Sequence, residues 1–313
     1  MEKSHEKYHR ILDRCKSLPP TPTAVAYPCD QASLAGAVEA AELGLLLPIL
    51  VGPRGKIEAV AKQSGLEISR YEIVDSPHSN AAAEAAVRHV REGKAEMLMK
   101  GSLHTDELMS AVVARDTGLR TARRISHCFI MDVPALERVL VITDAAVNVF
   151  PTLEDKVHII QNAIDLAHAL GKPQPKVAIL SAMETVNPKV QSTVEAAALC
   201  KMADRGQITG GLLDGPLALD NAVNLTAAKI KKIESPVAGQ ADILVAPDLE
   251  AGNMLAKSLS FLADADAAGI VLGARVPIIL TSRADSVMTR LASCAVAVLV
   301  AKFRRESGSE MAA

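Results

Sequence analysis

The segment Thr281–Ser286 brings hydroxyl groups, a guanidinium and a carboxylate together within a short stretch of sequence. It follows the apolar run Val276–Leu280, which is typical of a strand buried on both faces, and it precedes a predicted helix over Val287–Val300. Parallel sheets bind ligands at the carboxyl ends of their strands, and a helix N-terminus and an arginine side chain both favour anions. The segment is therefore a candidate anion site. The alternative is that Asp285 or Ser286 only caps the helix and that Arg283 lies on the surface.

Three further predicted strands end in polar residues. Carboxylates, hydroxyls and a lysine at neighbouring strand ends would form a cleft rich in oxygens and cations, which suits a phosphate-bearing substrate. Thr105, Asp214 and Asp248 could instead serve only as helix caps. The residues at these ends are Lys100, which closes the predicted strand 96–100, with Gly101, His104 and Thr105 after it; Asp214 and Gly215 after a strand ending at Leu213; and Asp248, Gly252 and Asn253 after the strand 243–246.

Two basic segments give weaker indications of function. Gly52–Lys56 resembles a phosphate loop, but it lacks the spacing and the terminal Ser or Thr of a nucleotide-binding loop, so an ordinary strand-to-helix turn is favoured. Arg120, Arg123 and Arg124 form a cluster that is typical of a solvated basic turn. We would assign one of these arginines to the lining of a cleft only if the ligand is anionic.

The composition excludes several classes of function. The 313 residues carry a formal net charge of −2 and 2% aromatic residues, so neither a basic surface for a nucleic-acid backbone nor aromatic platforms for single strands are expected. The longest apolar run, 291–301, is too short to span a bilayer, and Met1–Arg10 lacks the apolar core of a secretory signal. We expect a soluble cytoplasmic protein with no nucleic-acid or membrane partner.

The cysteines and histidines form no recognisable metal or disulfide pattern. The five cysteines are odd in number, scattered and without a C-x-x-C pair, which favours reduced thiols in a cytoplasm. His5 and His9 are four residues apart, but they lie in a polar segment with no further ligand nearby. No metal site is therefore expected. The lack of a G-x-G-x-x-G sequence after any predicted strand also counts against a Rossmann dinucleotide site.

The order of the predicted elements indicates an α/β fold. Strands alternate with helices from Ala24 onward, which is typical of parallel βαβ units. Ser126–Asp132 and Arg138–Thr143 break this rhythm, because a connection of a few residues cannot carry a parallel crossover, so these two strands are predicted to pair antiparallel. The chain length predicts one large or two medium domains, and we place a boundary near this hairpin. The alternation then resumes, with helices predicted over 188–205 and 218–230.

Five motifs occur in a fixed order along the chain. They are Lys100-Gly101-x-x-x-Thr105; Arg124 with Ser126, His127 and Phe129; Asp214-Gly215-Pro-x-Ala218; Pro247-Asp248-x-x-x-Gly252-Asn253; and Thr281-Ser282-Arg283-Ala-Asp285. Together they resemble the phosphate acetyltransferase and phosphate butyryltransferase family. The resemblance covers the chain from about Ala24 to Lys302, and the Asp-x-x-x-Gly-Asn and Thr-Ser-Arg elements are its most specific parts.

The resemblance implies a two-domain α/β fold, a sandwich of parallel and mixed sheets similar to the isocitrate and isopropylmalate dehydrogenases. Domain I would comprise residues 1–133 and 269–313, and domain II would be inserted as residues 134–268, with the active site in the cleft between them. The implied protein is a homodimer that reversibly transfers an acetyl or butyryl group between coenzyme A and inorganic phosphate. Coenzyme A, acyl phosphate and phosphate would be its substrates, with no bound cofactor.

The chemistry of acyl transfer suits the motif residues. Thiolate attack on an acyl phosphate needs a base for the thiol, donors for the carbonyl oxyanion and a cationic grip on phosphate. The resemblance implies that Ser282 hydrogen-bonds the sulfur or the leaving phosphate oxygen, that Arg283 stabilises the charged transition state, and that Arg124 holds phosphate or the acyl carbonyl. Transfer would be direct, without a cysteine nucleophile. In the acetyltransferases of the family the proposed base is a carboxylate whose position corresponds to about Thr289 in this chain. Threonine cannot act as this base, and the nearest carboxylate is Asp285, which is therefore our hypothesis for the base.

Two alternatives differ in class from an acyltransferase. The missing carboxylate at Thr289 motivates a non-catalytic paralogue that binds CoA or acyl phosphates as a sensor. An NAD-dependent decarboxylating dehydrogenase of related fold would instead require Asp214, Asp220 and Asp248 to hold Mg²⁺ with the substrate. Within the acyltransferase interpretation, the choice among acetyl, propionyl and butyryl groups stays open.

Overall fold

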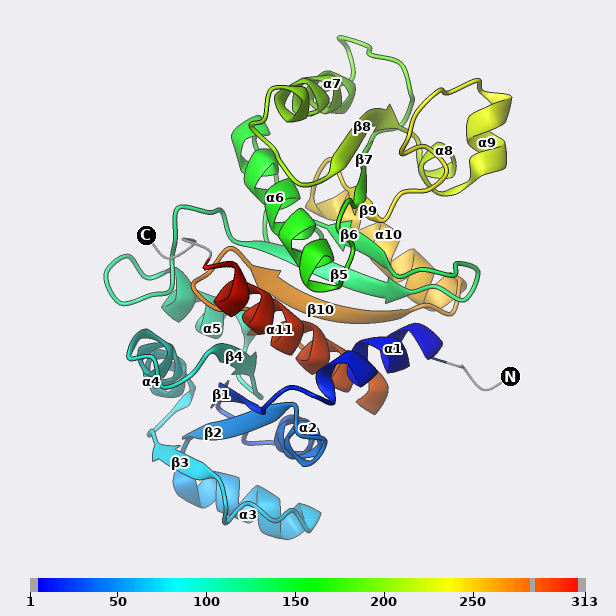
Figure 1. The fold of residues 1–313 in the computed structure, drawn as a ribbon. Coiled ribbons are helices and arrows are strands. Elements are labelled where there is room, and N and C mark those ends of the chain that lie inside the picture. The colour runs from blue at the N-terminus through cyan, green and yellow to red at the C-terminus, as the bar shows by residue number, and fades with distance from the viewer. Residues whose placement is uncertain (1–4, 282–284, 309–313) are drawn as a thin grey trace. The chain divides into compact units, whose positions relative to one another are not determined.

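The structure, a computed structural model, describes residues 5–281 and 285–308 of a mixed α/β protein (Figure 1). The chain divides into two compact units. Unit 1 comprises Met1–Arg123 and Ala268–Ala313, so it contains both chain ends, and unit 2 comprises Arg124–Ala267. The expected boundary after residue 133 would separate two strands that pair with each other, so the division falls before this hairpin.

Unit 1 contains a largely parallel sheet. Its strand order is β3-β2-β1-β4-β11-β10, in which all neighbours are parallel except β10, which runs antiparallel to β11. The predicted alternation of strands and helices in this part of the chain is confirmed. The elements are α1 (Glu6–Cys15), β1 (Thr21–Ala26), α2 (Gln31–Glu42), β2 (Leu46–Gly52), α3 (Arg54–Ser64), β3 (Glu72–Asp75), α4 (Ser79–Arg91), β4 (Met97–Lys100), α5 (Thr105–Val113), β10 (Asp266–Leu272), β11 (Ile278–Ile279) and α11 (Val287–Ser307).

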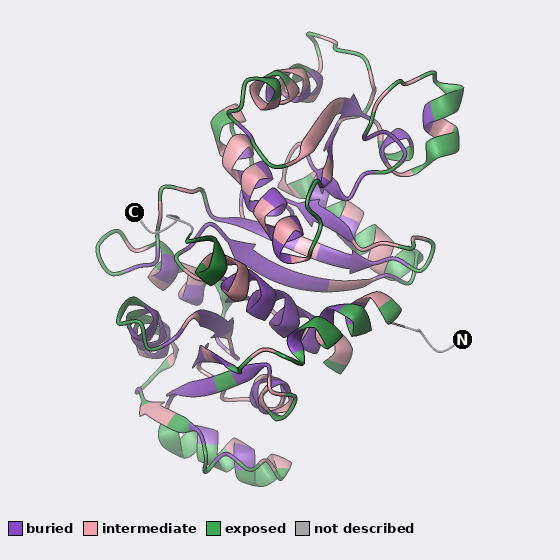
Figure 2. Cartoon of the chain, viewed as in Figure 1, coloured by how far each residue is buried: buried purple, intermediate pink, exposed green. Residues whose placement is uncertain are grey.

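The last helix is deeply buried in unit 1. α11 is buried without interruption from Leu291 to Ala301, which explains its small and apolar residues (Figure 2). α1 lies against it, because the Cys15 thiol donates to the Ala295 carbonyl at 3.5 Å. Tyr8 of α1 is fully buried, and its hydroxyl accepts a hydrogen bond from the Ala268 N–H at 2.8 Å. The polar N-terminal segment therefore contributes a helix that its composition does not predict.

Unit 2 has a mixed sheet of strand order β5-β6-β9-β7-β8. The predicted antiparallel hairpin is confirmed, with Cys128 opposite Thr143, and β6, β9, β7 and β8 run parallel. The predicted helix 218–230 is divided at Asn224, whose side chain caps the second half. The elements are β5 (Ser126–Asp132), β6 (Leu140–Thr143), α6 (Leu153–Ala169), β7 (Lys176–Leu180), α7 (Gln191–Asp204), β8 (Leu212–Leu217), α8 (Leu219–Val223), α9 (Leu225–Ile230), β9 (Ile243–Val245) and α10 (Leu249–Leu262).

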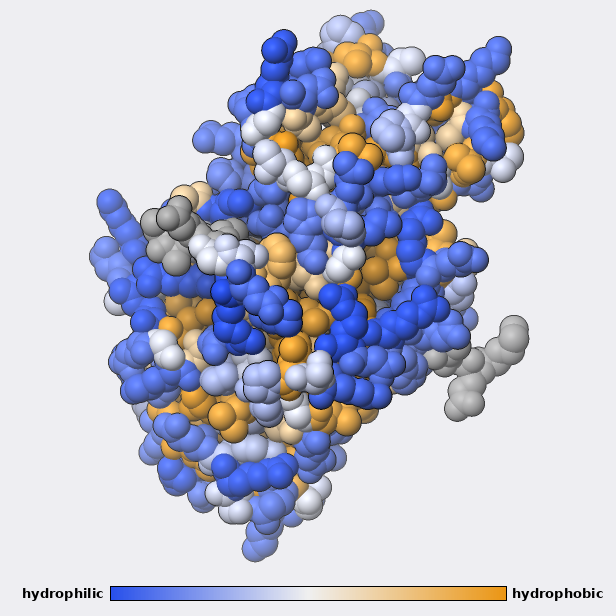
Figure 3. All heavy atoms as spheres, in the orientation of Figure 1, coloured by the Kyte–Doolittle hydropathy of each residue, from blue (hydrophilic) through white to orange (hydrophobic). Residues whose placement is uncertain are grey.

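The face shown in Figure 3 carries many hydrophilic residues and several local apolar patches. One patch lies over α9, where Leu225 and Ile230 are exposed. Within the residues that the structure describes, no helix combines the length and the apolar character needed to cross a bilayer.

Candidate active site

Two strands of unit 1 end side by side at the edge where a ligand site is predicted. β4 and β11 are parallel neighbours with Met99 opposite Ile279, so Lys100 and the residues after Ile279 begin at the same edge of the sheet. The predicted catalytic residues Ser282 and Arg283 follow there in sequence, but both lie outside the described residues. The pairing of β11 with β4 therefore brings the Lys100 segment next to the end of the strand that leads into Ser282 and Arg283.

The turn after β4 requires glycine at position 101. Gly101 N–H donates to the Ala26 carbonyl at 2.8 Å, and a Cβ at this position would lie 2.4 Å from that oxygen and 2.5 Å from the Tyr27 carbonyl oxygen. The Ser102 hydroxyl and N–H both donate to the Tyr27 carbonyl, at 2.9 and 2.8 Å. The loops after β1 and β4 are thus joined, which fixes the backbone that carries Lys100.

The helix after this turn, α5, is capped by His104 and not by Thr105. His104 is the N-cap of α5 and Thr105 is its first helical residue. The His104 N–H donates to the carboxylate of Glu107, the third residue of the helix, at 2.8 Å, so this free N–H group at the helix start has an acceptor. His104 and Thr105 are both exposed at the sheet edge that also carries Lys100. The interpretation of Thr105 as a helix cap is therefore wrong, whereas its ligand role stays a prediction.

Ser286, and not Asp285, caps the last helix. The Ser286 hydroxyl accepts the Thr289 N–H at 3.1 Å and donates to the Thr289 hydroxyl at 3.0 Å. The backbone carbonyl of Asp285 accepts a hydrogen bond from the Arg290 guanidinium at 2.8 Å, and the same guanidinium lies 3.8 Å from Glu39. The capping alternative therefore applies to Ser286 and leaves Asp285 as the first described residue after the predicted Ser-Arg pair.

In unit 2, a loop after β6 forms a polar centre that the sequence interpretation missed. The Asp144 carboxylate is buried and accepts the backbone N–H groups of Ala146, Val147 and Asn148 at 3.0 to 3.1 Å. The Asn148 side-chain amide also donates to this carboxylate. The sequence does contain an indication of this centre, because Asp144 directly follows the predicted strand 138–143. Asp248 follows the predicted strand 243–246 in a similar way.

Arg124 lies at the same edge of the unit 2 sheet. It precedes β5, which is antiparallel to β6, so its backbone adjoins the carboxyl end of β6. Its Nε donates to the Asn148 Oδ1 at 2.8 Å and lies 3.5 Å from Asp155. Its backbone carbonyl accepts the Asn162 amide at 2.9 Å. The side chain is 54% exposed, so its guanidinium is accessible to a ligand.

The start of α10 contacts the same loop. Asn253 donates to the Ala145 carbonyl at 3.1 Å, and a Cβ on Gly252 would lie 2.4 Å from the Asp144 carbonyl oxygen. Asp248 accepts the Ala251 N–H at 2.8 Å, which confirms its role as a helix cap. The structure therefore gathers Gly252, Asn253 and Arg124 around the Asp144–Asn148 loop.

Asp214 and Gly215 do not follow a strand, as predicted, but lie inside one. β8 continues to Leu217, with Asp214 opposite Ala178 of β7. A Cβ on Gly215 would lie 2.7 Å from the Ile179 Cβ, so close strand packing explains this glycine. Because β7 lies between β8 and β9, Asp214 and Asp248 belong to strands that are about 10 Å apart.

His127 of β5 is neutral at ordinary pH. Burial lowers its pKa to about 4, although the nearby Asp144 carboxylate opposes this shift. Its ring packs edge-on against Phe129 with centroids 4.4 Å apart. The motif residues His127 and Phe129 therefore support the packing of this strand, and contact of Arg124 with an anion stays a prediction.

The thiols are poorly suited to nucleophilic attack. Burial raises their pKa values to about 11 or about 12, the lower value applying to Cys15 and Cys29 and the higher to Cys128, Cys200 and Cys294. At pH 8, only about one in a thousand molecules of a thiol with a pKa of 11 is in the thiolate form, which is the nucleophile.

We therefore expect the predicted acyltransferase activity to survive treatment with iodoacetamide at pH 7.5 for the most part. The high pKa values keep the thiols protonated, and the protonated form reacts slowly. Residual turnover and the mass of the intact chain measure the outcome. Rapid inactivation that CoA prevents would contradict this expectation, because it would place a reactive thiol at the substrate site.

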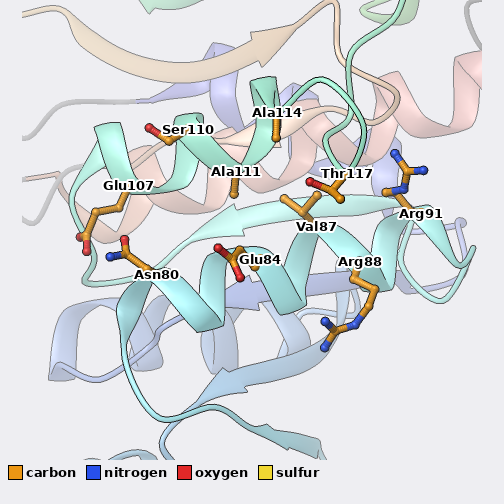
Figure 4. A pocket seen from close by; sticks show the side chains of 10 residues that line it. All are labelled: Asn80, Glu84, Val87, Arg88, Arg91, Glu107, Ser110, Ala111, Ala114 and Thr117. Carbon is orange, nitrogen blue, oxygen red and sulfur yellow. The ribbon is translucent and has the colours of Figure 1, made fainter.

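A separate pocket of about 620 Å³ lies between α4 and α5 in unit 1 (Figure 4). Its charged side chains are two glutamates and two arginines, so it has no excess of positive charge for a phosphate-bearing ligand. None of the predicted site residues lines it. The lining residues are Asn80, Glu84, Val87, Arg88, Arg91, Glu107, Ser110, Ala111, Ala114 and Thr117.

Comparisons with known proteins agree with the motifs. The family described as "Phosphate acetyl/butaryl transferase" matches residues 79–298. The chain is 66% identical to a phosphate acetyltransferase of Rhizobium meliloti, over 96% of this chain and 95% of the relative. It is 43% identical to a phosphate butyryltransferase of Clostridium beijerinckii, over 95% and 98% of the two chains. The crystal structure of a branched-chain phosphotransacylase from Enterococcus faecalis V583 has 29% identity and a TM-score of 0.78, over 90% of this chain and 99% of the other. The chain therefore belongs to the phosphate acetyl/butaryl transferase family.

Proposed function

We propose that this protein is an acyltransferase that reversibly transfers an acetyl group between coenzyme A and inorganic phosphate. The observation that carries the proposal is the 66% identity, over nearly the whole chain, to the phosphate acetyltransferase of Rhizobium meliloti. Coenzyme A is a substrate in this scheme, and no bound cofactor is required.

The proposed reaction needs no covalent intermediate on the protein. A phosphate oxygen attacks the thioester carbonyl, the carbonyl oxygen becomes an oxyanion, and the C–S bond then breaks to release CoA. The proton lost by hydrogen phosphate ends on the thiol. Arg124 and Arg283 supply positive charge for phosphate and the oxyanion, and Ser282 donates to the sulfur or the phosphate oxygen. Asp285 accepts the thiol proton in the reverse direction.

The other predicted site residues have binding roles in this proposal. Lys100 supplies a further cation, and Gly101 lets the backbone turn beside it. The side chains of His104 and Thr105 are exposed at the same sheet edge, which supports contact with substrate. In unit 2, Asn253 and Gly252 are assigned to substrate binding beside Arg124, and Asp214, Gly215 and Asp248 to shaping the surrounding backbone.

If Asp285 is the base, Asp285→Asn lowers kcat by roughly 10²- to 10⁴-fold, because the amide cannot accept the thiol proton. Asp116→Asn is the matched control, since Asp116 is an exposed carboxylate of the same unit, and it should keep normal kcat. Initial rates of thioester formation from acetyl phosphate and CoA check both variants. Near-normal turnover of Asp285→Asn would assign the base to another group.

The preferred acyl chain is proposed to be acetyl, with butyryl as the second candidate. The relative with 66% identity is a phosphate acetyltransferase, whereas the butyryltransferase of Clostridium beijerinckii is 43% identical. We expect kcat/KM to fall from acetyl to propionyl to butyryl phosphate when thioester formation with CoA is measured. A maximum at butyryl phosphate would reverse this order and favour the second candidate.

The two alternatives of other classes give different results in the same assays. A CoA sensor would bind CoA in a titration calorimeter but form no thioester from any acyl phosphate. A decarboxylating dehydrogenase would reduce NAD with isocitrate or isopropylmalate, which the absorbance of the reduced nicotinamide would report.

We also propose that the enzyme acts as a cytoplasmic homodimer, with the two compact units as its two domains. The cysteines in the described part of the chain are free thiols, which supports a reducing compartment. Met254 and Phe261 of α10 are 62% and 85% exposed and are seven residues apart, so they share an apolar helix face that supports self-association. Light scattering after size-exclusion chromatography would measure the state, with a monomer at micromolar concentration contradicting it.

A further inference from the structure

We infer that Asn148 is a positioning residue that orients the guanidinium of Arg124 for the phosphate group of the substrate. This inference rests on the proposed function, in which Arg124 holds phosphate or the acyl carbonyl. Asn148 itself does not touch substrate in this arrangement. It acts through the 2.8 Å hydrogen bond that its Oδ1 accepts from Arg124 Nε.

The orientation of the Asn148 amide is determined by its partners. Its Nδ2 donates to the Ile125 carbonyl at 2.9 Å and to the Asp144 carboxylate. Turning the amide over would place its oxygen against these two acceptors, which is unfavourable in a buried site. The residue is only 3% exposed. The oxygen therefore faces Arg124 and accepts the hydrogen bond from its Nε.

Asp144 anchors Asn148 on its other side. Asp144 is also 3% exposed, and its carboxylate is held by the N–H groups of Ala146, Val147 and Asn148. The same loop supports the start of α10, through Gly252 and Asn253. A continuous series of hydrogen bonds thus runs from the buried backbone of the loop to the partly exposed Arg124 side chain.

The contact at Nε decides which edge of the guanidinium is presented to a ligand. Arginine binds phosphate best through two parallel N–H groups. When Nε is held by Asn148, with Asp155 3.5 Å away, the edge formed by the two terminal nitrogens remains for a bidentate contact. Without Asn148, the flexible side chain would have to be ordered by the substrate at each binding event, which weakens the binding of phosphate.

A double-mutant cycle tests the inference with phosphate and acetyl-CoA as the varied substrates. We expect Asn148→Ala to raise the KM for phosphate roughly 10-fold, as for loss of one hydrogen bond to a charged group, and to leave the KM for acetyl-CoA within about 2-fold. In an Arg124→Ala background the same substitution should change the KM for phosphate by less than about 2-fold. Asn221→Ala is the control, because Asn221 is a buried asparagine of unit 2 outside this network, and it should leave the KM for phosphate unchanged.

Two additions keep the test valid if Asn148→Ala destabilises the fold. Asn148→Ser fills more of the site than alanine does, but its hydroxyl is too short to reach Arg124, so it should raise the KM for phosphate similarly. Arginine-selective ¹⁵N labelling reports the Arg124 Nε–H directly, and its exchange with water should be slow in the wild type and at least 10-fold faster in either variant. Unchanged exchange in a folded variant would overturn the inference.

The cycle separates failure of the inference from failure of the proposed function. If Arg124→Ala impairs phosphate use but Asn148→Ala adds the same factor in both backgrounds, Asn148 acts independently and the inference alone is wrong. If Arg124→Ala leaves all kinetic constants unchanged, the proposed role of Arg124 is wrong and the inference is overturned with it.

Discussion

Replacing Arg283 with alanine is expected to lower kcat by roughly 10²-fold or more. In the proposed reaction its guanidinium stabilises charge that develops on the carbonyl oxygen and the phosphate, and loss of one such donor has an effect of this size. The melting temperature should change little, because an arginine that serves the substrate contributes little to the fold. Initial rates and thermal unfolding of the same preparation measure the two quantities.

The matched control for this substitution is Arg70→Ala. Arg70 is an exposed arginine of unit 1, 4.0 Å from Glu42, and we assign it no role in catalysis. It should keep the wild-type kcat. An Arg283→Ala protein that turns over normally, or one that is inactive only because it is unfolded, would remove Arg283 from the mechanism.

The second large effect is expected from Gly252→Ala. Alanine is the better helix former, so helix propensity alone would predict a gain of up to about 1 kcal/mol. At this position, however, a Cβ would lie 2.4 Å from the Asp144 carbonyl oxygen and 3.1 Å from the Ala246 Cβ. We therefore expect a net loss of about 1 to 3 kcal/mol in the free energy of unfolding, as for other overpacked sites, together with a lower kcat/KM because the loop beside Arg124 is displaced.

Gly55→Ala provides the comparison that isolates the steric cause. Gly55 also lies in a helix, α3, but a Cβ there would meet no atom within 4 Å. This variant should be as stable as the wild type or more stable by a few tenths of a kcal/mol. Denaturant unfolding of both variants gives the difference. Equal stabilities would mean that α10 and the Asp144 loop adjust without cost.

The strand ends that hold most of the site could be predicted from the sequence because each combines a local apolar run with a following polar turn. The segments after β4 and β9 have this form, and the structure places Lys100 at the end of β4 and Asp248 three residues after the end of β9. The antiparallel hairpin of β5 and β6 could be predicted because its connection is too short for a parallel crossover.

The errors arise where tertiary pairing overrides local sequence. Asp214-Gly215-Pro216 has the composition of a turn, but pairing with β7 extends it as a strand. β10 (Asp266–Leu272) begins with an aspartate, two alanines and a glycine, which are poor strand formers, yet it is a strand whose Ile270 and Val271 pair antiparallel with β11. Conversely, the predicted strand 276–280 is reduced to Ile278–Ile279.

The hydrogen bonds around Arg124 could not be predicted for a different reason. Asn148 and Asn162 have no local signal that distinguishes them from other polar residues of a loop and a helix. Their role depends on the approach of segments 24 and 38 residues away from Arg124 in the sequence. Such contacts follow from the order of strands in the sheet, which the sequence pattern leaves open.

Release of CoA thiol from acetyl-CoA, followed with a thiol reagent as the phosphate concentration is varied, tests the proposed reaction most directly. A phosphate acetyltransferase should show no release without phosphate, a rate that saturates as phosphate is added, and one acetyl phosphate formed for each thiol. Thiol release that is independent of phosphate, or no release by the folded protein at any phosphate concentration, would contradict the assignment of this chain as a phosphate acyltransferase.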